Sequence, residues 1–101
     1  MLQTREQFAN SVVAAGLGSA QELHDFWNEL PAEQLPVDAE AASRLLVHHN
    51  RLTAFQANEI LHERNTPLVL NDYVILDRLG HGGMGVVFKA KHRRLERLVA
   101  L

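Results

Sequence analysis

Helix-start signals recur along the first two thirds of this 101-residue chain. Three of them are capping boxes, in which Ser or Thr is followed three residues later by Gln or Glu, and one is a plain N-cap aspartate. The four positions are Thr4, Ser19, Asp38 and Thr53. A shift of 34 residues superposes the first on the third and the second on the fourth, and it superposes Gly16 on Asn50, both of which suit a left-handed helix C-cap. The pattern predicts two copies of a helical hairpin.

Apolar residues recur at helical spacing after each start signal, so every predicted helix has one face to bury. The sets are Phe8, Val12 and Ala15; Leu23, Phe26, Trp27 and Leu30; Ala42, Leu45 and Leu46; and Ala57, Ile60 and Leu61. Two such hairpins can bury these faces only against each other, which predicts a compact four-helix module over residues 1–66. Pro31 and Pro36 bracket the link between its second and third helices. The period equals that of tetratricopeptide repeats, but the Trp, Gly, Tyr and Pro positions of that pattern are not met.

The adjacent aromatic residues Phe26 and Trp27 cannot both point into one helix-packing stripe. One of them is therefore expected at the margin of the core. That side chain either closes the core of the small bundle or forms an apolar surface patch where a partner or a second copy docks.

A glycine-rich segment stands between two strand-like runs near the end of the chain. Gly80, Gly82, Gly85 and Val87 fit the pattern G-x-G-x-x-G-x-V. Residues without a side chain let backbone N–H groups approach phosphate oxygens closely, so the spacing is typical of a phosphate-binding turn. The β-branched and aromatic residues after Gly85 continue as a strand, and no Gly-Lys-Ser/Thr triplet is present, which disfavours dinucleotide-binding and Walker-type loops. The alternative is a glycine-rich hairpin without a ligand.

Residues 73–101 closely resemble the opening of a bacterial Ser/Thr protein kinase domain, whose loops commonly read G-x-G-G-M-G-x-V. Val99-Ala100-Leu101 also resembles the first three positions of the V-A-I-K motif on the third strand of that domain. The resemblance implies that the chain is the N-terminal part of a longer kinase. The V-A-I-K lysine would be the next residue, and the H-R-D and D-F-G motifs would follow later. The chain itself is then expected to hold no catalytic residue.

The resemblance also implies which residues bind ATP, together with Mg²⁺, in the intact kinase. Leu79, Val87 and Ala100 would enclose the adenine, and backbone amides from His81 to Gly85 would face the phosphates. The full set is Leu79, Gly80, His81, Gly82, Gly83, Met84, Gly85, Val86, Val87 and Ala100. Because the rest of the cleft is absent, the chain alone is expected to have negligible ATP affinity and no kinase activity.

The helical half resembles short helical segments that precede the kinase domain in planctomycete-type Ser/Thr kinases, which share a phrase like Leu52-Thr53-Ala54-Phe55-Gln56-Ala57. The resemblance implies a kinase that phosphorylates protein Ser or Thr hydroxyls, with the helical module as a regulatory or dimerisation element. A second hypothesis is a non-catalytic adaptor or pseudokinase whose helical half recruits a protein partner. A lysine directly after Leu101, and later H-R-D and D-F-G motifs, would favour the first hypothesis.

Charge divides the chain into two parts. Residues 1–70 hold four basic and nine acidic side chains, whereas residues 71–101 hold six basic and three acidic ones. A basic surround suits a phosphate ligand, although a small positive excess is also ordinary surface variation. No basic patch with interleaved aromatic residues is present, so we do not expect nucleic acid as a partner.

Other kinds of site find little support in the sequence. The chain has no cysteine, which excludes disulfides and thiolate metal sites. His24 with Asp25, or His62 with Glu59, is a conceivable pair of metal ligands, but no H-E-x-x-H motif accompanies them, and solvated helix faces explain them better. Neither a signal peptide nor a run of roughly 20 apolar residues is found. We therefore expect a cytoplasmic segment without membrane contact, whatever membrane segment a longer parent carries downstream.

These observations predict a mainly α chain with a small β tail. The helical module occupies residues 1–66, a connector residues 67–72, and the first antiparallel strands of the kinase-like domain residues 73–101. Without a following helix or the remaining sheet, those strands would keep one apolar face and open edges uncovered. We therefore expect pairing between two copies or a disordered tail, and the helical module is a second candidate for homodimer formation.

Overall fold

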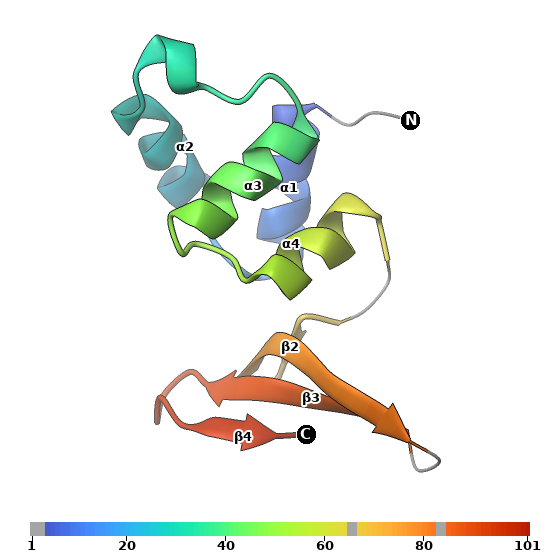
Figure 1. Ribbon diagram of the computed structural model, residues 1–101. Helices are drawn as coiled ribbons and strands as arrows, with labels where there is room; N and C mark the ends of the chain where they lie inside the picture. Colours follow the sequence, from blue (N-terminus) through green and yellow to red (C-terminus); the bar gives the residue numbers. More distant parts are fainter. Residues whose placement is uncertain (1–3, 65–66, 83–84) are drawn as a thin grey trace.

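The computed structural model describes residues 4–64, 67–82 and 85–101, without the side chain of His81. Within these ranges the chain forms four α-helices, one 3₁₀-helix and a four-stranded antiparallel sheet (Figure 1). The helices are α1 (Arg5–Ala14), α2 (Ala20–Glu29), η1 (Ala32–Gln34), α3 (Ala39–His48) and α4 (Ala54–Leu61). The strands are β1 (Val69–Leu70), β2 (Tyr73–Gly82), β3 (Gly85–His92) and β4 (Leu98–Ala100). The predicted class of four short helices followed by a small antiparallel sheet is confirmed, with one strand more than expected.

Each predicted helix start is confirmed by a side-chain cap. Both hydrogen bonds of the capping box are present in α1, α2 and α4, which begin after Thr4, Ser19 and Thr53. In α3, Asp38 Oδ1 accepts a hydrogen bond from Ala41 N at 2.8 Å. The first residues of α1 and α3 are 34 positions apart, and so are those of α2 and α4. The helix starts therefore follow the same period as the capping signals.

The two predicted left-handed residues are also confirmed. Gly16 has a φ of 79° after α1, and Asn50 has a φ of 59° after α3. A Cβ atom at Gly16 would lie 3.3 Å from Cγ2 of Val69, so this position combines a backbone angle and a close contact that both favour glycine. The turn after α1 thereby brings the helices close to the start of the sheet.

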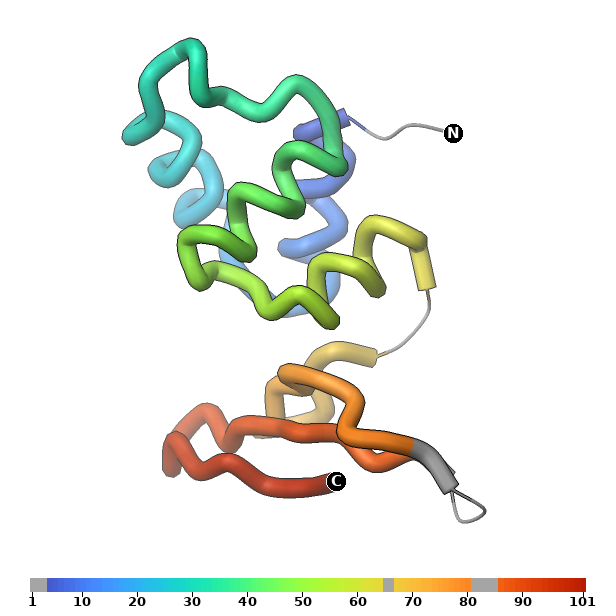
Figure 2. Tube along the Cα trace, viewed as in Figure 1, coloured from blue at the N-terminus to red at the C-terminus, as the bar shows by residue number. Residues whose placement is uncertain are grey.

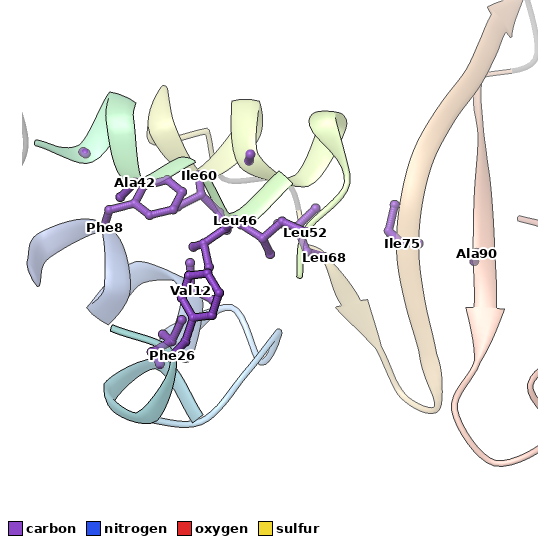
Figure 3. Packing of buried hydrophobic residues seen from close by; sticks show 13 residues of the cluster. Phe8, Val12, Phe26, Ala42, Leu46, Leu52, Ile60, Leu68, Ile75 and Ala90 are labelled. Atoms are coloured by element: carbon purple, nitrogen blue, oxygen red, sulfur yellow. The ribbon is translucent and has the colours of Figure 1, made fainter. Parts of the chain in front are cut away.

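One hydrophobic cluster joins the helices to the sheet (Figure 3). Phe8 and Leu46 lie fully buried among the helices, while Leu68, Ile75 and Ala90 add the contribution of the sheet. The expectation that the two helical hairpins bury their apolar faces only against each other is therefore wrong. A module of this size buries a modest core, and Leu68, which we expected in the connector, adds to it.

The adjacent aromatic residues of α2 divide as expected between the core and its margin. Phe26 is buried in the cluster, and Trp27 packs against it at a distance of 5.3 Å between ring centroids. The guanidinium carbon of Arg5 lies 5.9 Å from the centroid of the Trp27 ring. These contacts within the chain favour the first of the two predicted roles, in which the pair closes the core.

The sheet has the strand order β1-β2-β3-β4, and every neighbouring pair is antiparallel. The strand that we did not expect is β1, whose Val69 and Leu70 pair with Val74 and Tyr73. In Figure 1, β2 lies nearest the helices, and β3 and β4 follow at increasing distance. The tube in Figure 2 shows the same order along the Cα trace. The helices therefore meet the sheet at β2, where α4 makes the contact.

Part of the sheet stays uncovered. Among the described residues, large apolar side chains of the strands and the C-terminal residue that remain exposed are Leu70, Leu79, Val86, Val87, Leu98 and Leu101. The edge of β2, which we expected to be open, is covered in part by α4. Pairing of two copies through the remaining apolar surface stays a prediction.

Candidate nucleotide site

The glycine-rich segment forms the closed end of the β2–β3 hairpin. Gly80 pairs with Val87, and Gly82 pairs with Gly85. The predicted strands on both sides of the glycine-rich segment are therefore present, and β3 rather than a helix begins at Gly85. From the composition of residues 80–85 we expected a loop over this whole segment. Strand pairing instead continues to Gly82 and resumes at Gly85.

Three other predicted residues lie at this turn. Gly83 and Met84 fall outside the described residues. The backbone of His81 pairs with Val86, but its side chain is also outside the described part. The structure therefore describes the backbone on both sides of residues 83–84 but not those two residues.

The register of the hairpin brings three predicted residues to one face of the sheet. Directly opposed residues of an antiparallel pair share a face, and residues alternate between faces along a strand. Gly80 opposes Val87 on β3, and Lys89, two residues further along β3, opposes Ala100 on β4. Gly80, Val87 and Ala100 therefore share one face, with Lys89 between them.

The other face of the sheet joins the hydrophobic core. Phe88, Ala90 and Val99 occupy this face, and the Phe88 ring lies 6.1 Å from the ring of Phe55 in α4. Alternation along β3 gives Val86 the same side as Phe88. Val86 and Val87, both predicted at the nucleotide, therefore direct their side chains to opposite faces.

Gly80 borders open space on the face that it shares with Val87. A Cβ atom at this position would have no described heavy atom within 4 Å, and the backbone is not in the left-handed region. Neither packing nor the backbone angle therefore requires glycine here, in contrast to Gly16. A ligand that approaches the backbone closely would supply a reason for a residue without a side chain.

Leu79 is the extra residue of a β-bulge. Its neighbours Arg78 and Gly80 pair with consecutive residues of β3, so Leu79 has no direct partner across the hairpin. Its side chain is 58% exposed, compared with 42% for Val87. Bulges redirect side chains next to functional sites, and this one lies directly before the glycine-rich turn.

Lys89 is a residue of this face that the sequence analysis did not single out. It lies next to Ala100 on one side and opposite Asp77 of β2 on the other, so this face carries a cation and a carboxylate beside its apolar side chains. The signal in the sequence was the basic excess of residues 71–101 together with the alternation along β3. The apolar side chains and the accessible backbone of this face suit a ligand with an apolar ring, and Lys89 and Asp77 lie at its polar side.

The structure offers little support for a metal site or a membrane-spanning helix in the described part of the chain. Within the described ranges, no three His, Asp or Glu side chains gather closely enough to hold a metal ion. The predicted partner of His62, Glu59, is instead buried, with its Oε2 atom 3.1 Å from Nη1 of Arg64. None of the helices in the described part of the chain combines the length and the apolar character that crossing a bilayer requires.

No known family model matches this chain, and no solved structure matches it.

Proposed function

We propose that this chain is the N-terminal part of an ATP-dependent Ser/Thr protein kinase, with the helical module as its regulatory or dimerisation element. The observation that carries the proposal is the shared face of Gly80, Val87 and Ala100 on an antiparallel glycine-rich hairpin, with open space at Gly80. Glycine at this position leaves the backbone open to close approach by a ligand.

In this proposal the chain binds and orients ATP. Leu79, Val87 and Ala100 contact the adenine, and the backbone N–H groups of the turn face the phosphates. Lys89 lies on the same face and attracts the anionic nucleotide before it is bound. Mg²⁺ bound with the nucleotide would neutralise charge on the phosphates. The catalytic base and the metal ligands come from later parts of the parent protein, and a protein hydroxyl accepts the phosphoryl group.

A second candidate function is a non-catalytic interaction module. The observation in its favour is the single hydrophobic cluster that joins helices and sheet, because such a body needs no catalytic lobe to fold and to recruit a protein partner. The coding sequence beyond Leu101 separates the two candidates. A lysine at the next position and later H-R-D and D-F-G motifs favour the kinase, and their absence favours the adaptor.

The direct test is phosphoryl transfer from radiolabelled ATP by the full-length parent protein, compared with a Val87→Ala variant. The substitution removes two methyl groups from the adenine contact, which corresponds to about 1.6 kcal/mol and an increase of about tenfold in KM for ATP. Leu95→Ala is a suitable control, because Leu95 is 62% exposed in the turn between β3 and β4. Equal KM values for Val87→Ala and the unmodified protein would contradict the proposed adenine contact.

A further inference from the structure

The capping box of α4 makes two hydrogen bonds that reach outside its own helix. Thr53 Oγ1 accepts from Gln56 N at 3.1 Å and donates to the carbonyl oxygen of Leu76 at 2.6 Å. Gln56 Oε1 accepts from Thr53 N at 2.9 Å, while its Nε2 donates to the carbonyl oxygen of Ile75 at 2.7 Å. The same two side chains therefore cap α4 and bind two consecutive carbonyl groups of β2.

The other capping boxes in the described part of the chain make only their local bonds. Ser19 Oγ accepts from Glu22 N, and Glu22 Oε1 accepts from Ser19 N, with both residues exposed. In α4 the corresponding Gln56 is only 4% exposed. Local helix capping therefore does not account for the burial of Gln56 or for its contact with β2.

The two carbonyl groups stand where β2 has lost its neighbouring strand. Ile75 N donates to Leu68 O at 2.9 Å, and β1 pairs with β2 only before that point. Leu76 is the extra residue of a bulge, because Ile75 and Asp77 pair with consecutive residues of β3. The carbonyl groups of buried Ile75 and half-buried Leu76 need partners, and Gln56 and Thr53 supply them in place of a strand.

Packing beside this hydrogen-bonded contact is incomplete. A groove of about 580 Å³ lies beside the contact, between the helices and β2, and its lining includes Leu17, Leu52 and Val74. On the other side of the junction, the rings of Phe55 and Phe88 are in contact. The two donors therefore act together with the apolar contacts in positioning β2 against α4, and their directional bonds fix which carbonyl groups of β2 face the helix.

The glycine-rich hairpin begins directly after this contact. Residues 77–80 are exposed and, within the described part of the chain, pair only with β3. Opposite Asp77 and Arg78, β3 also pairs with β4 and with Leu101, so the hairpin becomes a two-stranded ribbon only from Gly80 onward. The orientation of such a ribbon depends on how its base is held. The bonds from Thr53 and Gln56 hold the β2 side of that base at Ile75 and Leu76, while pairing with β4 holds its β3 side.

We infer that Thr53 and Gln56 are positioning residues for the glycine-rich hairpin. They fix the bulge at Leu76, so a displacement of α4 changes the orientation of the hairpin, and the helical module thereby acts on the nucleotide site. The consequence for ATP rests on the proposed function, whereas the coupling of α4 to the hairpin does not. The inference gives the helical module a definite route of regulation.

Two substitutions remove the donors and keep the helix cap. Thr53→Asp keeps an acceptor for Gln56 N, as Asp38 does for α3, but a carboxylate cannot donate to Leu76 O. Gln56→Glu recreates the Ser19–Glu22 type of box and removes the donor to Ile75 O. Thr53→Ser keeps both functions of the hydroxyl and is the conservative control. Glu22→Gln is the matched control in the exposed box.

Amide hydrogen exchange on residues 1–101, followed by NMR, tests the coupling. Both donor-removing variants should speed exchange in the β2–β3 hairpin by about three- to tenfold relative to the amides of α1 and α3. Thr53→Ser and Glu22→Gln should leave the exchange unchanged. Equal acceleration at all amides would mean a purely structural role, and no acceleration would mean no coupling; either result would overturn the inference.

Kinetics of the full-length parent protein test the consequence for ATP. Thr53→Asp should raise KM for ATP several-fold, and Thr53→Ser should restore the value of the unmodified protein. If no form transfers phosphate, the proposed function fails, while the exchange experiment still decides whether α4 positions the hairpin. If the proteins are active and KM is unchanged in Thr53→Asp, the inferred effect on the nucleotide site is wrong.

Discussion

Replacing Ile75 by alanine should destabilise the helices and the sheet together. Ile75 lies on β2, is only 1% exposed, and belongs to the same hydrophobic cluster as Phe8 and Leu46. The substitution removes three carbon atoms, worth about 0.8 kcal/mol each, and leaves a cavity in a contact between two parts of the fold. We therefore expect the free energy of unfolding to fall by about 3 kcal/mol.

The fluorescence of Trp27 reports this effect from a distance. It is the single tryptophan of the chain and belongs to α2, an element that makes no contact with the described strands. With a urea dependence of about 1.5 kcal/mol per M, a loss of about 3 kcal/mol lowers the unfolding midpoint by about 2 M. Circular dichroism should give the same midpoint, because helices and sheet share one core.

Val37→Ala is the control for this experiment, because Val37 is 89% exposed and its truncation should change stability by less than about 0.5 kcal/mol. The reasoning is refuted if Ile75→Ala leaves the Trp27 transition unchanged. The helical module would then unfold independently of the sheet, as two separate domains would.

Two further substitutions test the turns and caps. Gly16→Ala should lower the thermal stability by the equivalent of about 1–2 kcal/mol, because alanine is strained at a φ of 79° and its Cβ would crowd Val69. Gly18→Ala is the matched control in the same turn, where a Cβ would meet nothing closer than 3.9 Å. Ser19→Ala should cost about 1 kcal/mol in urea unfolding through loss of the α2 cap, whereas Ser19→Asp should cost little. A full loss of stability in Ser19→Asp would contradict the capping explanation.

The sequence predicts the local features of this fold because their causes are local. The helix start at Ser19 and the left-handed angle at Gly16 depend on residues within one turn of the chain. The short strand at Val69 depends instead on pairing with β2 and on the close approach of Gly16, so it carries no signal that a local pattern could reveal. The shared core was missed for the same reason. In the sequence Leu68 is an ordinary apolar residue, and only the structure shows that it is buried.

The candidate site likewise combines features that the sequence predicts with features that only the structure reveals. The spacing of Gly80 and Val87 predicted a hairpin from the sequence, and the register adds that both share a face with Ala100. The bulge at Leu79 had no sequence signal, because a leucine in a strand pattern looks the same with or without a direct partner. The role of Lys89 became visible only with the register across β4.

Thr53 and Gln56 show how a correct local interpretation can still miss what a residue does. The capping box at these positions has the same sequence pattern as the box at Ser19 and Glu22, and the structure confirms both. The difference lies in one functional group: a carboxylate at residue 22 only accepts hydrogen bonds, whereas the amide at residue 56 accepts one from its own helix and donates another to β2. Glutamine can therefore serve a cap that is buried against a strand edge, whereas an exposed cap can use either residue, as Glu22 and Gln7 show. The exchange of Glu and Gln between the two boxes should consequently be asymmetric, with little effect at residue 22 and a loosened hairpin at residue 56.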